Sequence, residues 1–190
     1  MIFSKRMFIL ILVIVLMLSG VVEAKQLNDS WVRQEKSNWC WAASAENSVL
    51  YERNITRHQK DAVKYIKGGI LNPYPNVGGT AKDTKDAAQY ISNYTENYGY
   101  IEEKQTYSFL KSQIDRQNIT ITMAGYYKNN ERTHGHATII VGYNDENRYI
   151  TYFDPSDGKK YTCSYISYCD GSFNGRKFDM TIYNYDRNVC

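Results

Sequence analysis

The chain has 190 residues, a formal net charge of +3 and 43% hydrophobic residues. It contains no run of five like charges, so the sequence excludes the basic footprint of a protein that binds nucleic acid or anionic membranes. With 18 Tyr, only 3 Pro and no repeat or low-complexity tract, it also falls outside the disordered and fibrous classes.

The N-terminal segment has the pattern of a secretory signal peptide. Lys5 and Arg6 precede an unbroken apolar run at 8–18, and small residues lead to a cleavage site after Ala24. The run is shorter than the ~20 residues that a membrane span needs. We therefore expect a secreted protein with no stable membrane association after cleavage, and a single domain over residues 25–190.

Hydrophobic spacing predicts helices in the first half of the mature chain. After an extended lead-in, apolar residues at 42, 45 and 49 recur three and four positions apart, which is typical of a helix that begins at Cys40. The expected helices cover residues 40–51, 57–67, 81–92 and 106–117. A loop rich in Pro and Gly separates the second helix from the third.

After the last of these helices the apolar period changes from 3.6 to 2. Strands rich in β-branched residues and Tyr are expected at 119–127, 136–143, 148–153, 159–165 and 176–185. Turn signals at 144–147 and 154–160 join consecutive strands into hairpins. The sequence therefore predicts an α+β fold in which an N-terminal helical half packs against a C-terminal antiparallel sheet.

The placement of the four cysteines indicates two different roles. Cys40 stands alone, whereas Cys163, Cys169 and Cys190 lie close to the C-terminus. An exported protein can form a disulfide among these three, and the sequence leaves the pairing open. A thiol at the start of a helix has a lowered pKa, because the helix N-terminus stabilises the thiolate. Cys40 is therefore the candidate nucleophile, and its pairing with one of the other three cysteines is the alternative.

His136 and Asp154 are the expected partners of this thiol. The hairpin that turns at 144–147 brings the end of its second strand back to the start of its first, so that His136 and Asp154 lie close together. His134 is the alternative base, although we expect it to be a solvated loop residue and His58 to lie on the surface. Since an H-x-H pair lacks further ligands at a recognisable spacing, we expect no metal and no other cofactor.

The segments around these residues resemble the papain-like cysteine protease clan, in particular its bacterial C39-like and related effector papain-fold members. Gln34 precedes Cys40 by six residues, as in the papain pattern. Residues 39–43 read W-C-W-A-A, 135–137 read G-H-A before a V-G-Y strand, and a D-P pair follows the next strand at 154–155.

The resemblance implies a papain-like fold and hydrolysis of peptide bonds through a thioacyl-enzyme. It implies that Cys40 attacks the scissile carbonyl, that His136 protonates the leaving amine, and that Asp154 orients the imidazole. It further implies that Gln34 and the backbone N–H of the nucleophile form an oxyanion hole. The pair Gly78–Gly79 resembles the glycines that let a substrate backbone approach the cleft.

Partners and alternatives follow from the same residues. We expect a monomer that acts on a protein or peptide substrate, without an inhibitory prosegment, because only 15 residues separate the cleavage site from Cys40. A transglutaminase or deamidase would use the same thioacyl chemistry with a different acceptor, and a non-catalytic papain-fold module would bind a partner in the cleft without turnover. No residue of the sequence identifies the acceptor or the cleaved bond.

Overall fold

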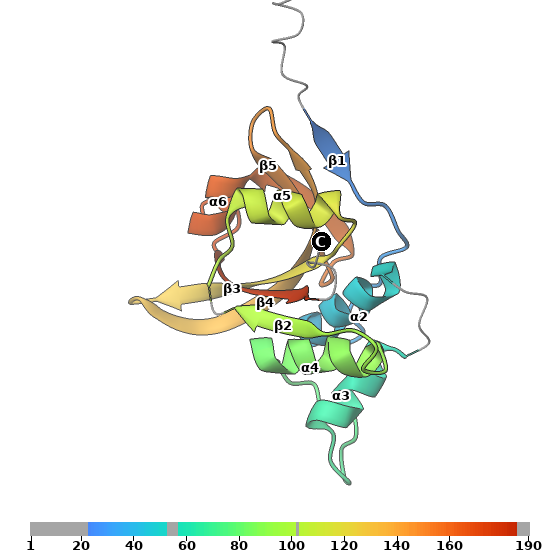
Figure 1. Cartoon of the computed structure of the whole chain (residues 1–190). Coiled ribbons are helices and arrows are strands. Elements are labelled where there is room, and N and C mark those ends of the chain that lie inside the picture. The colour runs from blue at the N-terminus through green and yellow to red at the C-terminus, as the bar shows by residue number, and fades with distance from the viewer. Residues whose placement is uncertain (1–22, 53–56, 102, 186–190) are drawn as a thin grey trace, which may run out of the picture.

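The computed structural model of the chain describes residues 23–52, 57–101 and 103–185. The expected signal peptide, up to residue 22, and Cys190 lie outside the described residues. One group of helices, α2 to α4, lies together on one side of the molecule, and the larger part of the sheet lies on the other side with α5 and α6 (Figure 1).

Four of the five described helices agree with the sequence prediction within two residues at each end. The helices are α2 (Cys40–Glu52), α3 (Gln59–Lys67), α4 (Ala81–Ile91), α5 (Tyr107–Asp115) and α6 (Tyr165–Asp170). The short α6 was not predicted, because its Tyr-rich segment continues the pattern of the strand before it. Within the described residues, no helix is both long enough and apolar enough to cross a membrane.

In the described part of the chain, seven strands form a single antiparallel sheet. They are β1 (Ala24–Gln26), β2 (Tyr98–Ile101), β3 (Thr120–Lys128), β4 (Glu131–Asn144), β5 (Tyr149–Asp154), β6 (Lys159–Ser164) and β7 (Lys177–Asn184). Their order is β2-β7-β3-β4-β5-β6, and β1 pairs with the last three residues of β4. The α+β prediction is confirmed, with two additions: β1 and β2 were not predicted as strands.

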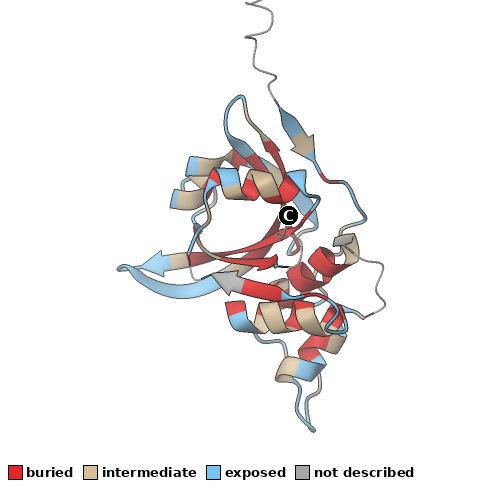
Figure 2. Ribbon diagram, in the orientation of Figure 1, coloured by how far each residue is buried: buried red, intermediate tan, exposed pale blue. Residues whose placement is uncertain are grey.

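The helix α2 is buried on almost every side, at the junction of the helical part and the sheet (Figure 2). Its polar residues Glu46 and Asn47 are as buried as its apolar face, so each needs hydrogen-bond partners. Glu46 Oε2 accepts from the backbone and side-chain N–H groups of Gln59, and Glu46 Oε1 lies 2.7 Å from His58 Nδ1. Asn47 exchanges hydrogen bonds with the backbone of Val32. These contacts fix the lead-in and α3 against the helix that carries the candidate nucleophile.

Candidate active site

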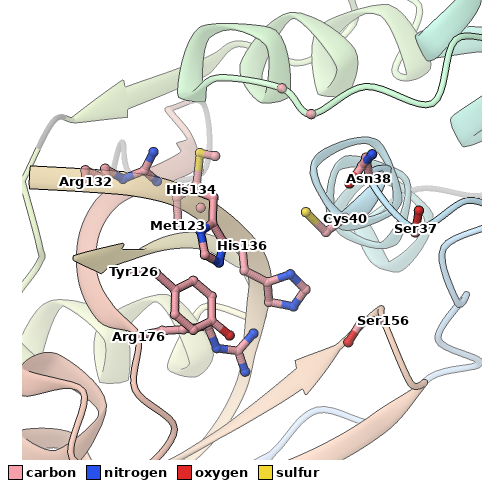
Figure 3. A pocket seen from close by; sticks show the side chains of 13 residues that line it. Ser37, Asn38, Cys40, Met123, Tyr126, Arg132, His134, His136, Ser156 and Arg176 are labelled. Atoms are coloured by element: carbon pink, nitrogen blue, oxygen red, sulfur yellow. The ribbon is translucent and has the colours of Figure 1, made fainter. Parts of the chain in front are cut away.

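A cleft of about 580 Å³ lies where the start of α2 meets the hairpin of β3 and β4. Its lining includes Cys40, the pair Gly78–Gly79 and His136. In Figure 3 the sulfur of Cys40 and the ring of His136 face each other across this cleft. The structure therefore brings together a thiol from the first residue of α2 and an imidazole from the middle of the sheet.

The thiol and the imidazole face each other across the cleft, and the far side of the imidazole is held by a carboxylate. His136 and Cys40 are close enough for each to shift the pKa of the other, and His136 Nε2 lies 2.7 Å from Asp154 Oδ1. Because Nε2 is engaged by the carboxylate, Nδ1 is the nitrogen that remains for the sulfur. The predicted hairpin geometry is confirmed: β4 and β5 pair Ile139 with Phe153, which places Asp154 close to His136.

Asp154 is buried and accepts hydrogen bonds on both carboxylate oxygens. Ser156 donates its backbone N–H and its hydroxyl to Oδ1, at 2.9 and 2.6 Å. Arg176 Nη2 donates to Oδ2 at 3.2 Å. Burial acts to raise the pKa of Asp154, but the hydrogen bond and charge of His136, together with Ser156, outweigh it and hold this pKa well below its usual range. The residue is therefore a carboxylate wherever the imidazole titrates.

The same contacts move the pKa values of the thiol and the imidazole in opposite directions. Burial acts to lower the pKa of His136, but the hydrogen bonds and charges of Asp154 and Cys40 outweigh it and raise this pKa to about 9. Burial acts to raise the pKa of Cys40, but the hydrogen bond and charge of His136, with backbone hydrogen bonds, outweigh it and lower this pKa. A thiolate–imidazolium pair is therefore favoured near neutral pH.

Arg176 is a site residue that the sequence did not predict. It directly precedes β7, and its side chain is only 12% exposed. This side chain contacts the carboxylate of Asp154, the last residue of β5, which lies far from Arg176 in the sequence. A single Arg before a strand carries no sequence signal of this role, because only the folded sheet brings the two side chains together.

We expect Arg176→Gln to lower kcat about tenfold with little change in KM, since a hydrogen bond to a charged group contributes about 1.5–3 kcal/mol and this one fixes the plane of the Asp154 carboxylate. Arg176→Lys should restore part of the loss. Steady-state kinetics on a cleaved peptide measure both effects. An unchanged kcat in a folded Arg176→Gln variant would show that Ser156 and His136 alone suffice to hold the carboxylate.

Two tryptophans that flank the nucleophile fix the opposite wall of the cleft. Both are buried, as expected of packing residues. Trp39 Nε1 donates to the carbonyl of Pro75 at 2.9 Å, and Trp41 Nε1 donates to that of Val77 at 3.1 Å. These bonds hold the loop that ends at Gly78–Gly79 against the start of α2. Both glycines line the cleft, and their contact with a substrate backbone stays a prediction.

The two glycines offer a matched test of this wall. A Cβ at Gly79 would lie 2.4 Å from Cδ2 of Trp41, whereas a Cβ at Gly78 would meet no atom within 4 Å. We therefore expect Gly79→Ala to lower the free energy of unfolding by about 1–3 kcal/mol, as overpacking typically does, and Gly78→Ala to leave it nearly unchanged. Urea unfolding of both variants measures the difference, and equal stabilities would contradict the contact.

Gln34 lies beside the turn that follows Asp154 but is not among the residues that line the cleft. Its backbone N–H donates to the carbonyl of Pro155 at 2.9 Å. Its side-chain Nε2 donates to the carbonyls of Lys36 and Ser37, at 2.9 and 2.8 Å. Since these bonds engage the side-chain amide within the lead-in, its contribution to an oxyanion hole stays a prediction.

The remaining histidines have other surroundings. His134 is exposed and lines the cleft, but it belongs to β4 and stacks on Tyr126 with ring centroids 4.2 Å apart, so the loop assignment was wrong. His58 is exposed as predicted and precedes α3 as its N-cap.

Among the described residues, no group of three or more His, Cys, Asp or Glu side chains is placed to hold a metal ion. Cys40, Cys163 and Cys169 are free thiols.

A thiol at a helix N-terminus, an imidazole from an antiparallel sheet and a carboxylate behind it define the papain-like class of cysteine peptidases on this α+β fold. The chain belongs to the Peptidase_C39 like family, whose model matches residues 26–178, and it is a cysteine-type peptidase. Its fold is similar to that of xylellain, a cysteine protease from Xylella fastidiosa whose crystal structure is known: the TM-score is 0.51 and the identity 13%, over 86% of this chain and 87% of that chain. Compared by sequence, no curated protein matches.

Proposed function

We propose that this chain is a secreted peptidase that hydrolyses peptide bonds through a Cys40–His136–Asp154 triad and a thioacyl-enzyme intermediate. The observation that carries the proposal is the arrangement of a thiol that faces an imidazole across an open cleft, with a buried carboxylate 2.7 Å from the far nitrogen of that imidazole. Secretion is supported by the signal-peptide pattern at residues 1–24. The mature protein acts as a monomer on a protein or peptide substrate.

In acylation, the Cys40 thiolate attacks the scissile carbonyl carbon, and the negative charge moves to the carbonyl oxygen. This oxygen faces the N-terminus of α2, where backbone N–H groups lack intrahelical partners and the helix dipole favours an anion. His136 gives the proton on Nδ1 to the leaving nitrogen, the C–N bond breaks, and a thioester to Cys40 remains.

In deacylation, the neutral imidazole of His136 takes a proton from a water molecule whose oxygen attacks the thioester carbon. The C–S bond breaks, the new carboxylic acid leaves, and the thiolate–imidazolium pair is restored. Asp154 holds the ring in one orientation through Nε2 during both steps and stabilises its positive charge.

Digestion of a peptide library by the mature protein tests this proposal, with new termini identified by mass spectrometry. A sample whose thiols are blocked by iodoacetamide serves as the control. New internal termini that are missing from the blocked sample support hydrolysis. A gain of about 1 Da on Gln without backbone cleavage would instead indicate a deamidase, in which the thiolate attacks the side-chain amide of Gln, ammonia leaves, and water hydrolyses the thioester. Binding of peptides without any mass change would indicate a non-catalytic module.

A further inference from the structure

Arg132 is a cationic side chain that lines the cleft but does not belong to the triad. Arg132 lies on β4, the strand that also carries His136, and both line the cleft with Cys40. Figure 3 shows Arg132 towards one end of the cleft and Cys40 towards the other. Neither the proposed chemistry nor the hydrogen bonds of the triad involve this arginine, so its position calls for another role.

Two glycines make room for the guanidinium on the surface of the strands. Gly125 of β3 and Gly135 of β4 are direct partners in the sheet. A Cβ at Gly135 would lie 2.2 Å from Arg132 Nη2, and a Cβ at Gly125 would lie 2.8 Å from Arg132 Nε. Any larger residue at either position would displace the side chain. The guanidinium is therefore seated against the residue that directly precedes His136.

A carboxylate holds this guanidinium through one nitrogen. Arg132 Nε donates to Asp179 Oδ2 at 2.8 Å, and the hydroxyl of Tyr127 donates to the same oxygen at 3.0 Å. Among the described residues, no hydrogen bond engages Nη1 or Nη2 of Arg132, and the side chain is 31% exposed. Arginine presents its N–H donors in a rigid planar fork that matches the two oxygens of a carboxylate. The orientation of the fork is thus fixed while two of its nitrogens stay available.

The residues that line the cleft have a one-sided charge. They include two arginines, Arg132 and Arg176, and two histidines, His134 and His136, but no Asp or Glu. The carboxylates that pair with the arginines, Asp154 and Asp179, are not among the lining residues. A surface of this kind attracts an anionic ligand and disfavours a cationic one.

Resting on the function proposed above, we propose that Arg132 determines specificity: its free Nη donors bind the carboxylate of an Asp or Glu side chain close to the scissile bond. Arg132 lines the same cleft of about 580 Å³ as Cys40 and His136, and an extended peptide advances about 3.3 Å per residue. The acidic side chain therefore lies within about two residues of the bond that Cys40 attacks. The substrates are peptides or exposed protein segments that carry this acidic residue.

Paired peptides test the assignment. Starting from a peptide that the protein cleaves, Glu and Gln are compared at each of the three positions on either side of the cut, since this pair differs in charge but hardly in size. At one position within two residues of the cut, kcat/KM should favour Glu about tenfold, the lower end of what a charged hydrogen bond contributes. In Arg132→Gln this ratio should fall to about one.

A matched control and two further measurements complete the test. Lys60→Gln removes a positive charge from an exposed position on α3 and should keep the preference for Glu.

In the native protein, the ratio of kcat/KM for the Glu and Gln peptides should decrease as salt rises from about 0.05 M to about 0.5 M, because salt screens the contact. In a Cys40→Ala background, calorimetry should show tighter binding of the Glu peptide, and Arg132→Lys, which keeps the charge without the fork, should retain only part of this difference.

The outcomes separate the two proposals. Cleavage of Glu and Gln peptides at equal rates by the native protein, a ratio that does not depend on salt, or a preference that survives in Arg132→Gln, would each overturn the role of Arg132 and leave the peptidase proposal intact. A native protein that cleaves no peptide would remove the proposed function and the specificity that rests on it.

Discussion

Cys40→Ala is expected to reduce peptide cleavage below detection while the fold is retained. Without the sulfur no thioester can form, and loss of the nucleophile in a comparable peptidase triad lowers kcat by roughly 10⁶-fold. The fold should persist because Ala is the best helix former and α2 begins at this residue. Cleavage of a peptide library measures the loss, and near-UV circular dichroism and thermal unfolding show whether the native packing remains.

Cys169→Ala is the matched control for this prediction. It removes a partly exposed thiol from α6, away from the residues that line the cleft. We expect its kcat/KM to stay close to that of the native protein. Cleavage that persists in Cys40→Ala would show that another group performs the hydrolysis, and equal losses in both variants would point to a general effect of thiol removal.

Asp154→Asn is expected to lower kcat by about 10⁴-fold, the loss seen when the equivalent carboxylate of another triad is replaced by an amide. The neutral amide no longer stabilises the imidazolium, and it can select the wrong tautomer of His136. The contact of Asp154 with Arg176 also changes, from an ion pair to a hydrogen bond between the charged guanidinium and a neutral amide. Single-turnover kinetics on a cleaved peptide measure the chemical step directly.

The pKa of His136 determines the direction in which the pH profile of this variant should shift. His136 must carry a proton to pair with the thiolate, and this proton is present below the pKa of about 9 to which Asp154 and Cys40 raise it, and is lost above that pH. The native kcat/KM should therefore fall as pH rises through about 9. Without the carboxylate the pKa should return towards its ordinary value, so the alkaline limb of Asp154→Asn should move towards neutral pH.

Asp157→Asn is the control for the pH profile. Asp157 lies in the turn after β5 and bonds to Lys159 and Tyr161 rather than to the imidazole. The alkaline limb of the Asp157→Asn profile should coincide with that of the native protein. If the limb of Asp154→Asn also stays near the native position, Asp154 is not the group that raises the pKa of His136.

The elements around the site could be predicted because local patterns determine them. The helix that begins at Cys40 and the hairpin of β4 and β5 follow from apolar spacing and from the turn residues at 144–147. Two of the three missed elements, β2 and α6, show why the rest could not be predicted. The strand β2 has four residues and is defined by its pairing with the distant β7, and α6 has six residues in a Tyr-rich segment. Short elements of this kind carry little pattern of their own.

The same difference between local patterns and distant contacts separates the site residues that could be predicted from those that could not. Cys40, His136 and Asp154 could be predicted as candidates because a hairpin and a helix start constrain them and because their segments resemble a known clan. Arg132 and Arg176 were missed because each is defined by a partner that only the sheet brings near, Asp179 and Asp154. Contacts between residues so far apart in the sequence leave no signal in its spacing.

The most direct test of the central claim is the rate at which iodoacetamide alkylates Cys40 as a function of pH, read by mass spectrometry of the peptide that contains this residue. The thiolate reacts and the thiol does not. The account predicts rapid alkylation well below the ordinary cysteine pKa of about 8.5, with a midpoint that rises to that value or above in His136→Ala. A native midpoint at or above that of free cysteine, unchanged in His136→Ala, would contradict it.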